Sequence, residues 1–369
     1  MHRPLTKTRV PTQPLHHLKP ERFETVGVLK ALAGANRQLA ELKGVSASIP
    51  NQNILVATLG MQEAKDSSAI ENIVTTHDEL FRDALMPESG ASPAVKEVLR
   101  YRQALVVSFE EVRKTGVLSN NHILRIQAAL EMNEAGFRKV PGTTLKNERG
   151  AVVYTPPLPD RILPMMSDLE RFMNEERLAV DPLIRMALIH HQFETIHPFY
   201  DGNGRTGRII NVLYLVKEGL LDVPVLYMSR YIIRTKDEYY RLLQSVREHD
   251  AWEEWVTYML TAVAESARDG IRTVADIKSL LLDYKHRIRQ ELPKIYSQDL
   301  INNIFSHPYT KIQFVEDDLG VSRLTATKYL DKLSAAGFLV KEKAGRSSFY
   351  LNMALYDILT APGMQGPVR

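Results

Sequence analysis

The stretch HPFYDGNGRTGR, residues 197–208, decides how the rest of this 369-residue chain is interpreted. It lies between two apolar segments that have helical periodicity. The segment before it, 181–196, begins with Asp181 as a candidate cap and carries apolar residues at helical spacing. The segment after it, 208–217, has the same periodicity and stops before Gly219. The sequence therefore predicts a tight loop between two buried helices.

The loop has the composition of an anion-binding site. Glycines at 202, 204 and 207 allow backbone N–H groups to approach a ligand closely, and the start of the following helix adds its positive end. Arg205 and Arg208 are three residues apart on that helix, so both guanidinium groups can reach a polyphosphate. We expect the loop to cradle phosphates.

Two further residues of the loop add chemistry to this cradle. Asp201 can hold a divalent cation, and a neutral imidazole at His197 can take a proton from an incoming hydroxyl. A base, a metal site and a phosphate site together are what phosphoryl or nucleotidyl transfer needs. The alternative is a simple turn with solvated charges, because short glycine patterns recur by chance.

The complete string fits the Fic motif, His-Pro-Phe-x-Asp/Glu-Gly-Asn-Gly-Arg-x-x-Arg, so the chain resembles Fic-domain proteins. The resemblance covers roughly residues 60–260 and implies a Fic-type helical core with a β-hairpin flap. Together with a winged helix-turn-helix domain, which the pattern of the C-terminal residues indicates, this core makes the expected fold mainly α. The resemblance also implies transfer of AMP from Mg-ATP to a Ser, Thr or Tyr hydroxyl of a target protein, including the enzyme itself. Relatives can move UMP, phosphate or phosphocholine, and the intact loop through Arg208 favours ATP.

The resemblance also implies a role for each residue of the site. His197 is the general base and Asp201 holds Mg2+. Tyr239 and Tyr240, which could equally be core aromatics, are candidates for lining the adenine pocket. The remaining residues implied to bind the nucleotide are Gly202, Asn203, Gly204, Arg205, Thr206, Gly207 and Arg208.

A second short pattern precedes the loop. Ser67 and Glu71 lie four apart on one helix face and are followed by Asn72; on local grounds they could be a solvated helix end. The pattern resembles the Fic inhibitory motif, Ser/Thr-x-x-x-Glu-Gly/Asn. A carboxylate at Glu71 placed against Arg208 would occupy the guanidinium group and repel the nucleotide, which is an off switch. The same carboxylate could orient water for the removal of AMP.

Residues 136–159 are rich in glycine and proline and predict a hairpin. Its strands are expected at 143–146 and 151–154, joined by a turn at 147–150. The hairpin could be a loose surface feature. In Fic proteins the equivalent hairpin is a flap that pairs with an extended segment of the target, so the resemblance places a target protein at 143–154.

We expect four regions along the chain: an N-terminal helical region with the inhibitory helix (1–95), the Fic catalytic domain (96–260), a connector helix (261–294) and a winged helix-like domain (295–369). An extended arm is expected over 1–22, and Gly270 is a point where the connector could bend or divide. Further helices are expected at 23–42, with Val28, Leu29, Leu32 and Leu39 toward the core, and at 53–73, 92–115, 121–132, 165–176, 237–246 and 252–290.

The last region predicts three helices and a wing. The helices are expected at 302–305, 315–319 and 322–336, and the wing strands at 338–341 and 347–351. Its recognition helix is weakly basic, with Arg323, Lys328 and Lys332 beside Asp331, so DNA is an alternative partner and is not favoured. A dimerisation or docking module is the other interpretation, and we expect a homo-oligomer.

Composition restricts the remaining possibilities. The net charge of +3 is too small to indicate a nucleic-acid or membrane partner by itself. The absence of cysteine excludes disulfides, thiolate nucleophiles and Cys-ligated zinc. Residues 1–20 lack the apolar core of a signal peptide, and no apolar run reaches the length of a membrane span, so we expect a cytoplasmic protein without membrane contact.

Two rival functions remain open. His190 and His197 are seven apart and could share a helix face as metal ligands, but Pro198 favours a helix end near His197, and no glutamate stands in the zincin arrangement. The other rival is a DNA-binding regulator that senses a nucleotide without turnover. His197 distinguishes it from an enzyme, because a sensor needs the phosphate cradle and has no use for a base beside it.

Overall fold

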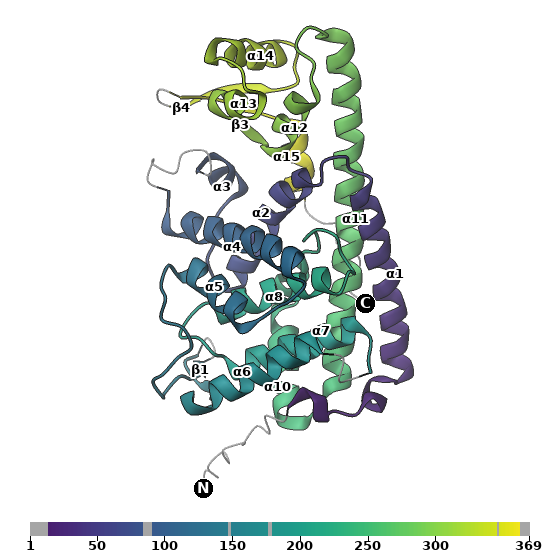
Figure 1. Ribbon diagram of the computed structural model, residues 1–369, viewed down its shortest axis with the longest axis vertical. Coiled ribbons are helices and arrows are strands. Elements are labelled where there is room, and N and C mark those ends of the chain that lie inside the picture. Colours follow the sequence, from purple (N-terminus) through teal and green to yellow (C-terminus); the bar gives the residue numbers. More distant parts are fainter. Residues whose placement is uncertain (1–13, 84–90, 147–148, 176–178, 345–346, 362–369) are drawn as a thin grey trace. The chain divides into compact units, whose positions relative to one another are not determined.

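The computed structural model describes residues 14–83, 91–146, 149–175, 179–344 and 347–361 (Figure 1). It is mostly helical and consists of two compact units. The first unit comprises Met1–Ala40 and Gln103–Ser266, and the second comprises Glu41–Arg102 and Ala267–Arg369. Three long helices, α1 (Val26–Ala47), α4 (Pro93–Thr115) and α11 (Trp252–Glu291), pass from one unit into the other.

The first unit carries the loop of residues 197–208. Besides its parts of the three long helices, it contains η1 (Leu15–His17), η2 (Pro20–Phe23), α5 (Asn120–Glu131), β1 (Leu145–Lys146), β2 (Val152–Tyr154), α6 (Pro159–Asn174), α7 (Pro182–Ile196), α8 (Asn203–Lys217), α9 (Met228–Arg234) and α10 (Lys236–His249). The loop therefore joins α7 to α8.

Helix α7 is the centre of the first unit, with α6 and α8 packed beside it (Figure 1). Every residue from Leu183 to Ile196 is buried, which is why the segment is apolar on most of its faces. The predicted start is confirmed: the Asp181 side chain accepts a hydrogen bond from the N–H of Leu183 at 2.8 Å, and Pro182 stands in the first turn. The C-terminal end of this buried helix presents His197.

Helix α8 begins at Asn203, five residues before the predicted start at 208, so that boundary was wrong. Gly202 is its N-cap, in the left-handed region with φ 80°. Gly207 lies inside the helix, facing α7. A side chain would not fit there, because a Cβ on residue 207 would come within 2.7 Å of Glu194 Oε1. Helix packing thus overrides the low helix propensity of glycine. The predicted end is confirmed, with Gly219 at φ 69° just beyond Lys217.

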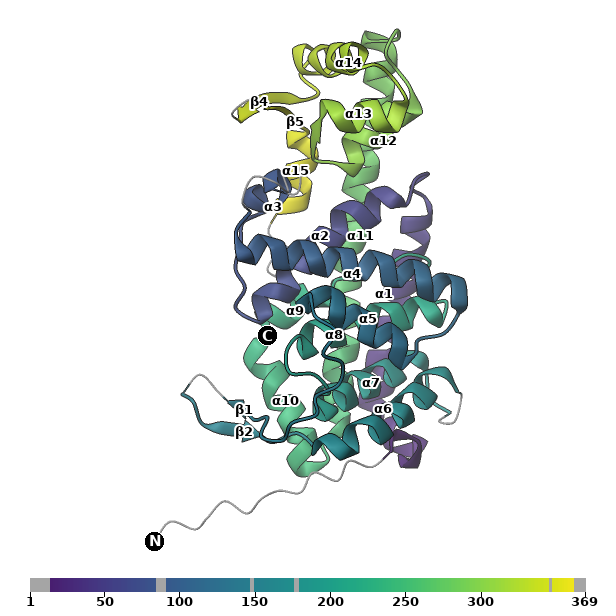
Figure 2. The same ribbon diagram turned by 60° about the vertical axis from the view of Figure 1, so that its left-hand side comes forward.

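The predicted hairpin is confirmed, with strands shorter than the expected 143–146 and 151–154. Strands β1 and β2 pair antiparallel, with Leu145 opposite Tyr154, and the pair projects from the helices of the first unit (Figure 2). The first two residues of the predicted turn, 147 and 148, lie outside the described residues.

The second unit joins the helix of the Ser67 pattern to the C-terminal part of the chain. It contains α2 (Asn53–Ile70), α3 (His77–Asp83), α12 (Gln298–Ser306), β3 (Tyr309–Lys311), α13 (Ile312–Leu319), α14 (Arg323–Ala335), β4 (Val340–Ala344), β5 (Ser347–Leu351) and α15 (Met353–Thr360). Helix α2 packs against α12 and α15, and the Gln62 side chain donates to Leu359 O. This division cuts across the four regions expected from sequence, whose boundaries stay predictions.

The C-terminal elements follow the predicted order of three helices and two wing strands, and they include two more. Strand β3 was not expected; it completes an antiparallel sheet of order β3-β5-β4. Helix α15 was not expected either. The first wing strand spans 340–344 instead of 338–341, because Phe338 and Leu339 are buried and serve the core before the strand starts.

Other differences concern the edges of elements. Residues 14–22, expected to be extended, belong to a segment with two 3-10 turns, Leu15–His17 and Pro20–Phe23, which bury Leu15 and Phe23. The helix expected from Phe23 starts at Val26. Helix α6 starts at Pro159 instead of 165 and accommodates Pro164. In α1 the buried stripe is Val28, Ala35, Leu39 and Leu42, so Leu29, expected in the core, is exposed and Leu32 is half-buried. Helix α11 continues through Gly270 without a break.

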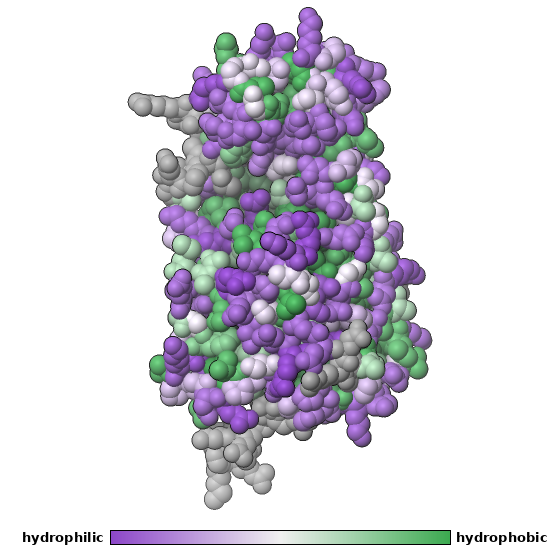
Figure 3. Space-filling view, viewed as in Figure 1, coloured by the Kyte–Doolittle hydropathy of each residue, from purple (hydrophilic) through white to green (hydrophobic). Residues whose placement is uncertain are grey.

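Hydrophilic residues predominate on the face that Figure 3 shows, with single hydrophobic residues between them. Among the described helices none combines the length and the apolar composition needed to cross a bilayer.

Candidate active site

His197 occupies the C-cap of α7 in the left-handed region, with φ 49° and ψ 61°. Its N–H still donates to Phe193 O at 2.9 Å, so the residue ends the helix as Pro198 predicts. A non-glycine residue in this region costs on the order of 1 kcal/mol and persists only when its surroundings hold it. The direction of the imidazole therefore depends on what fixes the end of α7.

Side chains from outside the helix cap the last carbonyl groups of α7. The hydrogen bonds are Arg247 to Glu194 O at 3.1 Å, Tyr154 to Thr195 O at 2.7 Å, Arg138 to Ile196 O at 3.5 Å and Arg138 to His197 O at 2.9 Å. Cationic groups are favourable at a helix C-terminus. Burial raises the pKa of Tyr154 to about 12, against the opposing charges of Arg247 and Arg138, so its hydroxyl keeps the proton that it donates.

Asn203 closes the loop on itself. Its side-chain oxygen accepts from Phe199 N, and its side-chain nitrogen donates to Phe199 O, both at 2.9 Å. The group that Asn203 can offer to an anion is thus its backbone N–H, at the start of α8, where Gly202 forms the N-cap and Gly204 is half-buried. The side chain is thus used within the loop, and the backbone N–H is the group left for an anion.

Arg205 is held by a carboxylate that sequence reasoning missed. Its guanidinium lies 2.7 Å from Glu131 Oε1, at the end of α5, and 3.8 Å from Asp201 Oδ1. The Arg205 side chain is only 4% exposed. The same Glu131 oxygen lies 2.7 Å from where a Cβ on Gly202 would be. A glycine is therefore needed at 202 for two reasons: it leaves room for the Glu131 carboxylate, and it adopts the positive φ of the N-cap. No local pattern marks Glu131, because it is 74 residues away from Arg205.

Asp201 fits a cation that is shared with a nucleotide. Its side chain is 79% exposed beside the cradle, and one oxygen accepts from Gly202 N at 2.7 Å. Mg2+ at nucleotide sites typically uses one or two carboxylates, phosphate oxygens and water. In the described part of the chain no group of three or more His, Cys, Asp or Glu could hold a metal by itself. Asp201 would therefore share Mg2+ with the phosphates and water.

The other residues of the predicted loop lie in α8. Thr206 is completely buried and its N–H donates to Gly202 O at 2.9 Å, so in this structure it serves the packing of the helix. Arg208 is 2% exposed and lies near His190. Burial, together with the charge of Arg208, lowers the pKa of His190 to about 3, so His190 is neutral at physiological pH.

His190, which with His197 raised the metal alternative, and its neighbour His191 both contact core groups. His190 Nε2 lies 2.8 Å from the Tyr239 hydroxyl, and His191 Nε2 lies 3.2 Å from Leu243 O. Tyr239 is 1% exposed, whereas the neighbouring Tyr240 is 44% exposed. Of the two tyrosines predicted at the adenine pocket, Tyr240 is the one with ring surface outside the core.

The predicted inhibitory residues end α2 in the second unit. Ser67 is completely buried, so the alternative of a solvated Ser/Glu pair is wrong for it. Glu71 is the half-buried C-cap of α2, and Asn72 follows with φ 64°. Because Glu71 and Arg208 belong to different units, their pairing stays a prediction.

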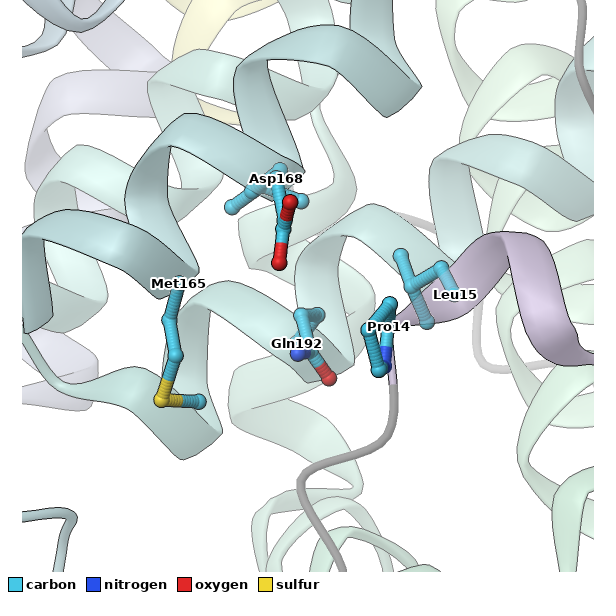
Figure 4. A pocket seen from close by; sticks show the side chains of 6 residues that line it. Pro14, Leu15, Met165, Asp168 and Gln192 are labelled. Carbon is cyan, nitrogen blue, oxygen red and sulfur yellow. The ribbon is translucent and has the colours of Figure 1, made fainter. Parts of the chain in front are cut away.

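A small pocket lies elsewhere in the first unit (Figure 4). It is lined by Pro14 and Leu15 at the start of the described chain, by Met165, Asp168 and Leu169 of α6, and by Gln192 of α7. Residues 197–208 do not contribute to its lining. The loop of residues 197–208, and not this pocket, is the candidate active site.

The Glu131–Arg205 pair leads to a prediction about stability. Glu131→Gln leaves the buried charge of Arg205 without its close carboxylate, so we expect a loss of about 1–3 kcal/mol in the free energy of unfolding. Glu110→Gln is the control, because the ion pair of Glu110 with Arg113 is exposed and should contribute little. Urea denaturation of both variants measures the difference. Equal losses would contradict a structural role for the Glu131–Arg205 pair.

Three family models match this chain. They are the Fic/DOC family N-terminal model over residues 29–110, the Fic/DOC family model over 117–215, and the model for the C-terminal domain of SoFic-like protein adenylyltransferases over 280–355. The central match contains the loop and the hairpin.

Curated relatives match part of the chain. Protein adenylyltransferase fic-1 of Caenorhabditis briggsae is 32% identical over 132 residues, which are 33% of this chain and 24% of the relative. Protein adenylyltransferase Fic of Drosophila erecta is 33% identical over 142 residues, 38% of this chain and 24% of the relative. The matched part thus spans about a quarter of the length of these relatives.

Solved structures share the fold. A Fic family protein from Desulfovibrio desulfuricans superimposes with a TM-score of 0.57 at 21% identity, covering 89% of this chain and 96% of that one. Fic-1 from Caenorhabditis elegans superimposes with a TM-score of 0.52 at 21% identity, covering 67% and 74%.

Proposed function

The chain belongs to the Fic/DOC family, and from this premise we propose that it transfers AMP from Mg-ATP to a hydroxyl side chain of a target protein, including its own. The observation that carries the proposal is the junction of α7 and α8. There His197 stands at the C-terminus of one helix, and the N-terminus of the next begins six residues later at Asn203. The relatives named protein adenylyltransferase support the same activity.

The backbone N–H groups at the start of α8 and the positive end of that helix bind the phosphates. Arg205 and Arg208 add positive charge from the same helix. Asp201 is the candidate ligand for Mg2+, which would supply charge neutralisation at the phosphate oxygens. The Glu131 and Asn203 contacts hold this cradle in shape before the nucleotide arrives.

His197 acts on the attacking hydroxyl. Its imidazole takes the proton while the hydroxyl oxygen forms a bond to the α-phosphorus of ATP. The bond between that phosphorus and the bridging oxygen to the β-phosphate breaks, and pyrophosphate leaves with the electron pair. The product is a phosphodiester that joins AMP to the target side chain.

The hairpin is the proposed docking place for the target. Strands β1 and β2 form a two-stranded sheet, and Val152 and Val153 are exposed on it. An extended segment of the target can add to this sheet by backbone hydrogen bonds, which bring its hydroxyl side chain toward His197. We propose further that Glu71 holds the enzyme off by binding Arg208, and that the chain assembles with copies of itself.

The nucleotide-sensing DNA regulator is the alternative function. In the C-terminal elements, Lys341 lies 2.6 Å from Asp331 and Arg323 lies 3.8 Å from Glu316, so two of the basic side chains already face carboxylates. DNA binders usually present a stronger basic surface. A base at His197 adds nothing to sensing, so the enzyme is favoured.

Labelled ATP tests the proposed function. ATP carrying the label at the α- or at the γ-phosphate is offered to the wild type and to Glu71→Gly, and protein-bound label is counted. Protein-bound α-label without γ-label supports AMP transfer. Protein-bound γ-label would show phosphate transfer instead, and ATP binding without any protein-bound label would support the sensing alternative.

A further inference from the structure

Arg138 is a buried arginine that the catalytic chemistry described above does not use. It lies in the segment between α5 and β1 and is 2% exposed. Its guanidinium donates to His197 O at 2.9 Å, to Ile196 O at 3.5 Å and to Pro157 O. Its backbone N–H donates to Pro198 O at 2.8 Å. One residue thus contacts both the end of α7 and the root of the hairpin.

The neighbours of Arg138 extend this attachment along the loop. The backbone N–H groups of Lys139 and Val140 donate to the Tyr200 hydroxyl at 2.9 and 3.1 Å. The rings of Phe137 and Phe199 lie 5.4 Å apart. Residues 137–140 are therefore fixed to residues 197–200 over the whole start of the active-site loop.

From these contacts we propose that Arg138 is a positioning residue that sets the place of the His197 imidazole relative to a target segment bound on the hairpin. The inference rests on the proposed function, because it needs a hydroxyl delivered by the hairpin. The contact with Pro157 gives the coupling, since Pro157 follows β2 by three residues. The Arg138 guanidinium thus donates hydrogen bonds both to the backbone of the proposed base, His197, and to Pro157 beside the hairpin.

His197 needs such support because its backbone is strained. A left-handed residue with φ 49° keeps that conformation only while its carbonyl and its neighbours are held. The hydrogen bond from Arg138 Nε holds the His197 carbonyl directly. Loss of this bond allows the imidazole to shift, and misplacement by about 1 Å can reduce a rate by about a hundredfold.

The arrangement of these carbonyl acceptors requires the planar guanidinium group of arginine. The guanidinium donates in several fixed directions at once, toward the end of α7 and toward Pro157. A lysine ammonium is a compact charge and cannot span them with the same geometry. Arg138→Lys therefore keeps the charge and removes the link between the helix and the hairpin.

The first experiment compares Arg138→Lys with Arg185→Lys, each in the full chain and in the Glu71→Gly background. Arg185 is a matched control: it is buried in the same unit and donates to the backbone carbonyls of Phe172 and Glu175, away from the loop. We expect Arg138→Lys to lower the kcat of self-modification at least tenfold with the KM for ATP within twofold. Both substitutions should lower the melting temperature by similar amounts, but Arg185→Lys should leave kcat within twofold of its value in the same background.

Chemical rescue adds a readout that a purely structural role would not move. Guanidinium ion at millimolar concentration should restore several-fold activity to Arg138→Ala and none to Arg185→Ala. An unchanged kcat in folded Arg138→Lys, or an equal fall in Arg185→Lys, would overturn the inference.

Hydrogen exchange tests the positioning independently of turnover. In Arg138→Lys the amides of residues 138–140 and of His197 should exchange at least tenfold faster than in Arg185→Lys, because their acceptors lose their alignment. Unchanged protection would overturn the inference whether or not label is transferred. If the starting protein transfers no label while exchange behaves as expected, the proposed function fails and the positioning role stands.

Discussion

Replacement of His197 by alanine is expected to reduce the transfer of AMP to protein by at least about a hundredfold. The affinity for ATP should stay within about threefold, because the cradle is built from the start of α8 and not from the imidazole. On the proposed function, the variant removes the group that takes the proton of the attacking hydroxyl and keeps the charges that bind phosphate. Rates of α-label transfer, measured beside ATP titrations by calorimetry, give both quantities.

His249→Ala is the matched control for this experiment. His249 is an exposed residue at the end of α10, and its loss removes an imidazole without touching the loop. We expect wild-type rates from it. Undiminished labelling by His197→Ala would show that another group serves as the base.

Replacement of Glu71 by glycine is expected to raise the initial rate of AMP transfer by about 10- to 100-fold. A charge-assisted hydrogen bond contributes about 1.5–3 kcal/mol. If Glu71 binds Arg208 as proposed, this is the free energy that becomes available for binding the γ-phosphate when the carboxylate is removed. Glu71→Gln, which keeps the size and loses the charge, should show a smaller rise. Arg208→Ala should lower transfer in either background.

The two effects are expected to be non-additive. Once Arg208 is absent, removal of Glu71 has no guanidinium left to release, so the double variant should match Arg208→Ala. Removal of AMP from pre-modified target is followed separately, because a carboxylate that orients water would lower net modification by the reverse route. Equal forward rates for the wild type and Glu71→Gly would end the inhibitory interpretation.

The features that local sequence determines were predicted well. The Asp181 cap, the helix end at His197, the break at Gly219 and the hairpin all follow from rules that act over a few residues, and the structure contains each of them. Tight turns need particular backbone angles, and few residue types supply them. This is why the loop between two helices could be placed before its surroundings were known.

Boundaries were predicted less well wherever packing outweighs propensity. The glycines of the loop indicated irregular structure as far as 208, yet α8 starts at Asn203, because the gain from packing against α7 exceeds the cost of Gly207 in a helix. Leu29 of α1 illustrates the same limit. The burial stripe of that helix depends on what packs beside it, and periodicity alone did not choose between neighbouring faces.

By itself the sequence determined the loop and the residues proposed as its base and as its phosphate ligands, because a motif of adjacent residues carries them. Only the tertiary structure decided what holds them: Glu131 reaches Arg205 from 74 residues away, and Arg138 reaches His197 from 59 residues away. It also decided that Tyr239 is buried against His190 and that α2 packs with the C-terminal helices. Such contacts leave no local pattern, since a buried charge needs a partner in space and the chain can supply it from any element that the fold brings near.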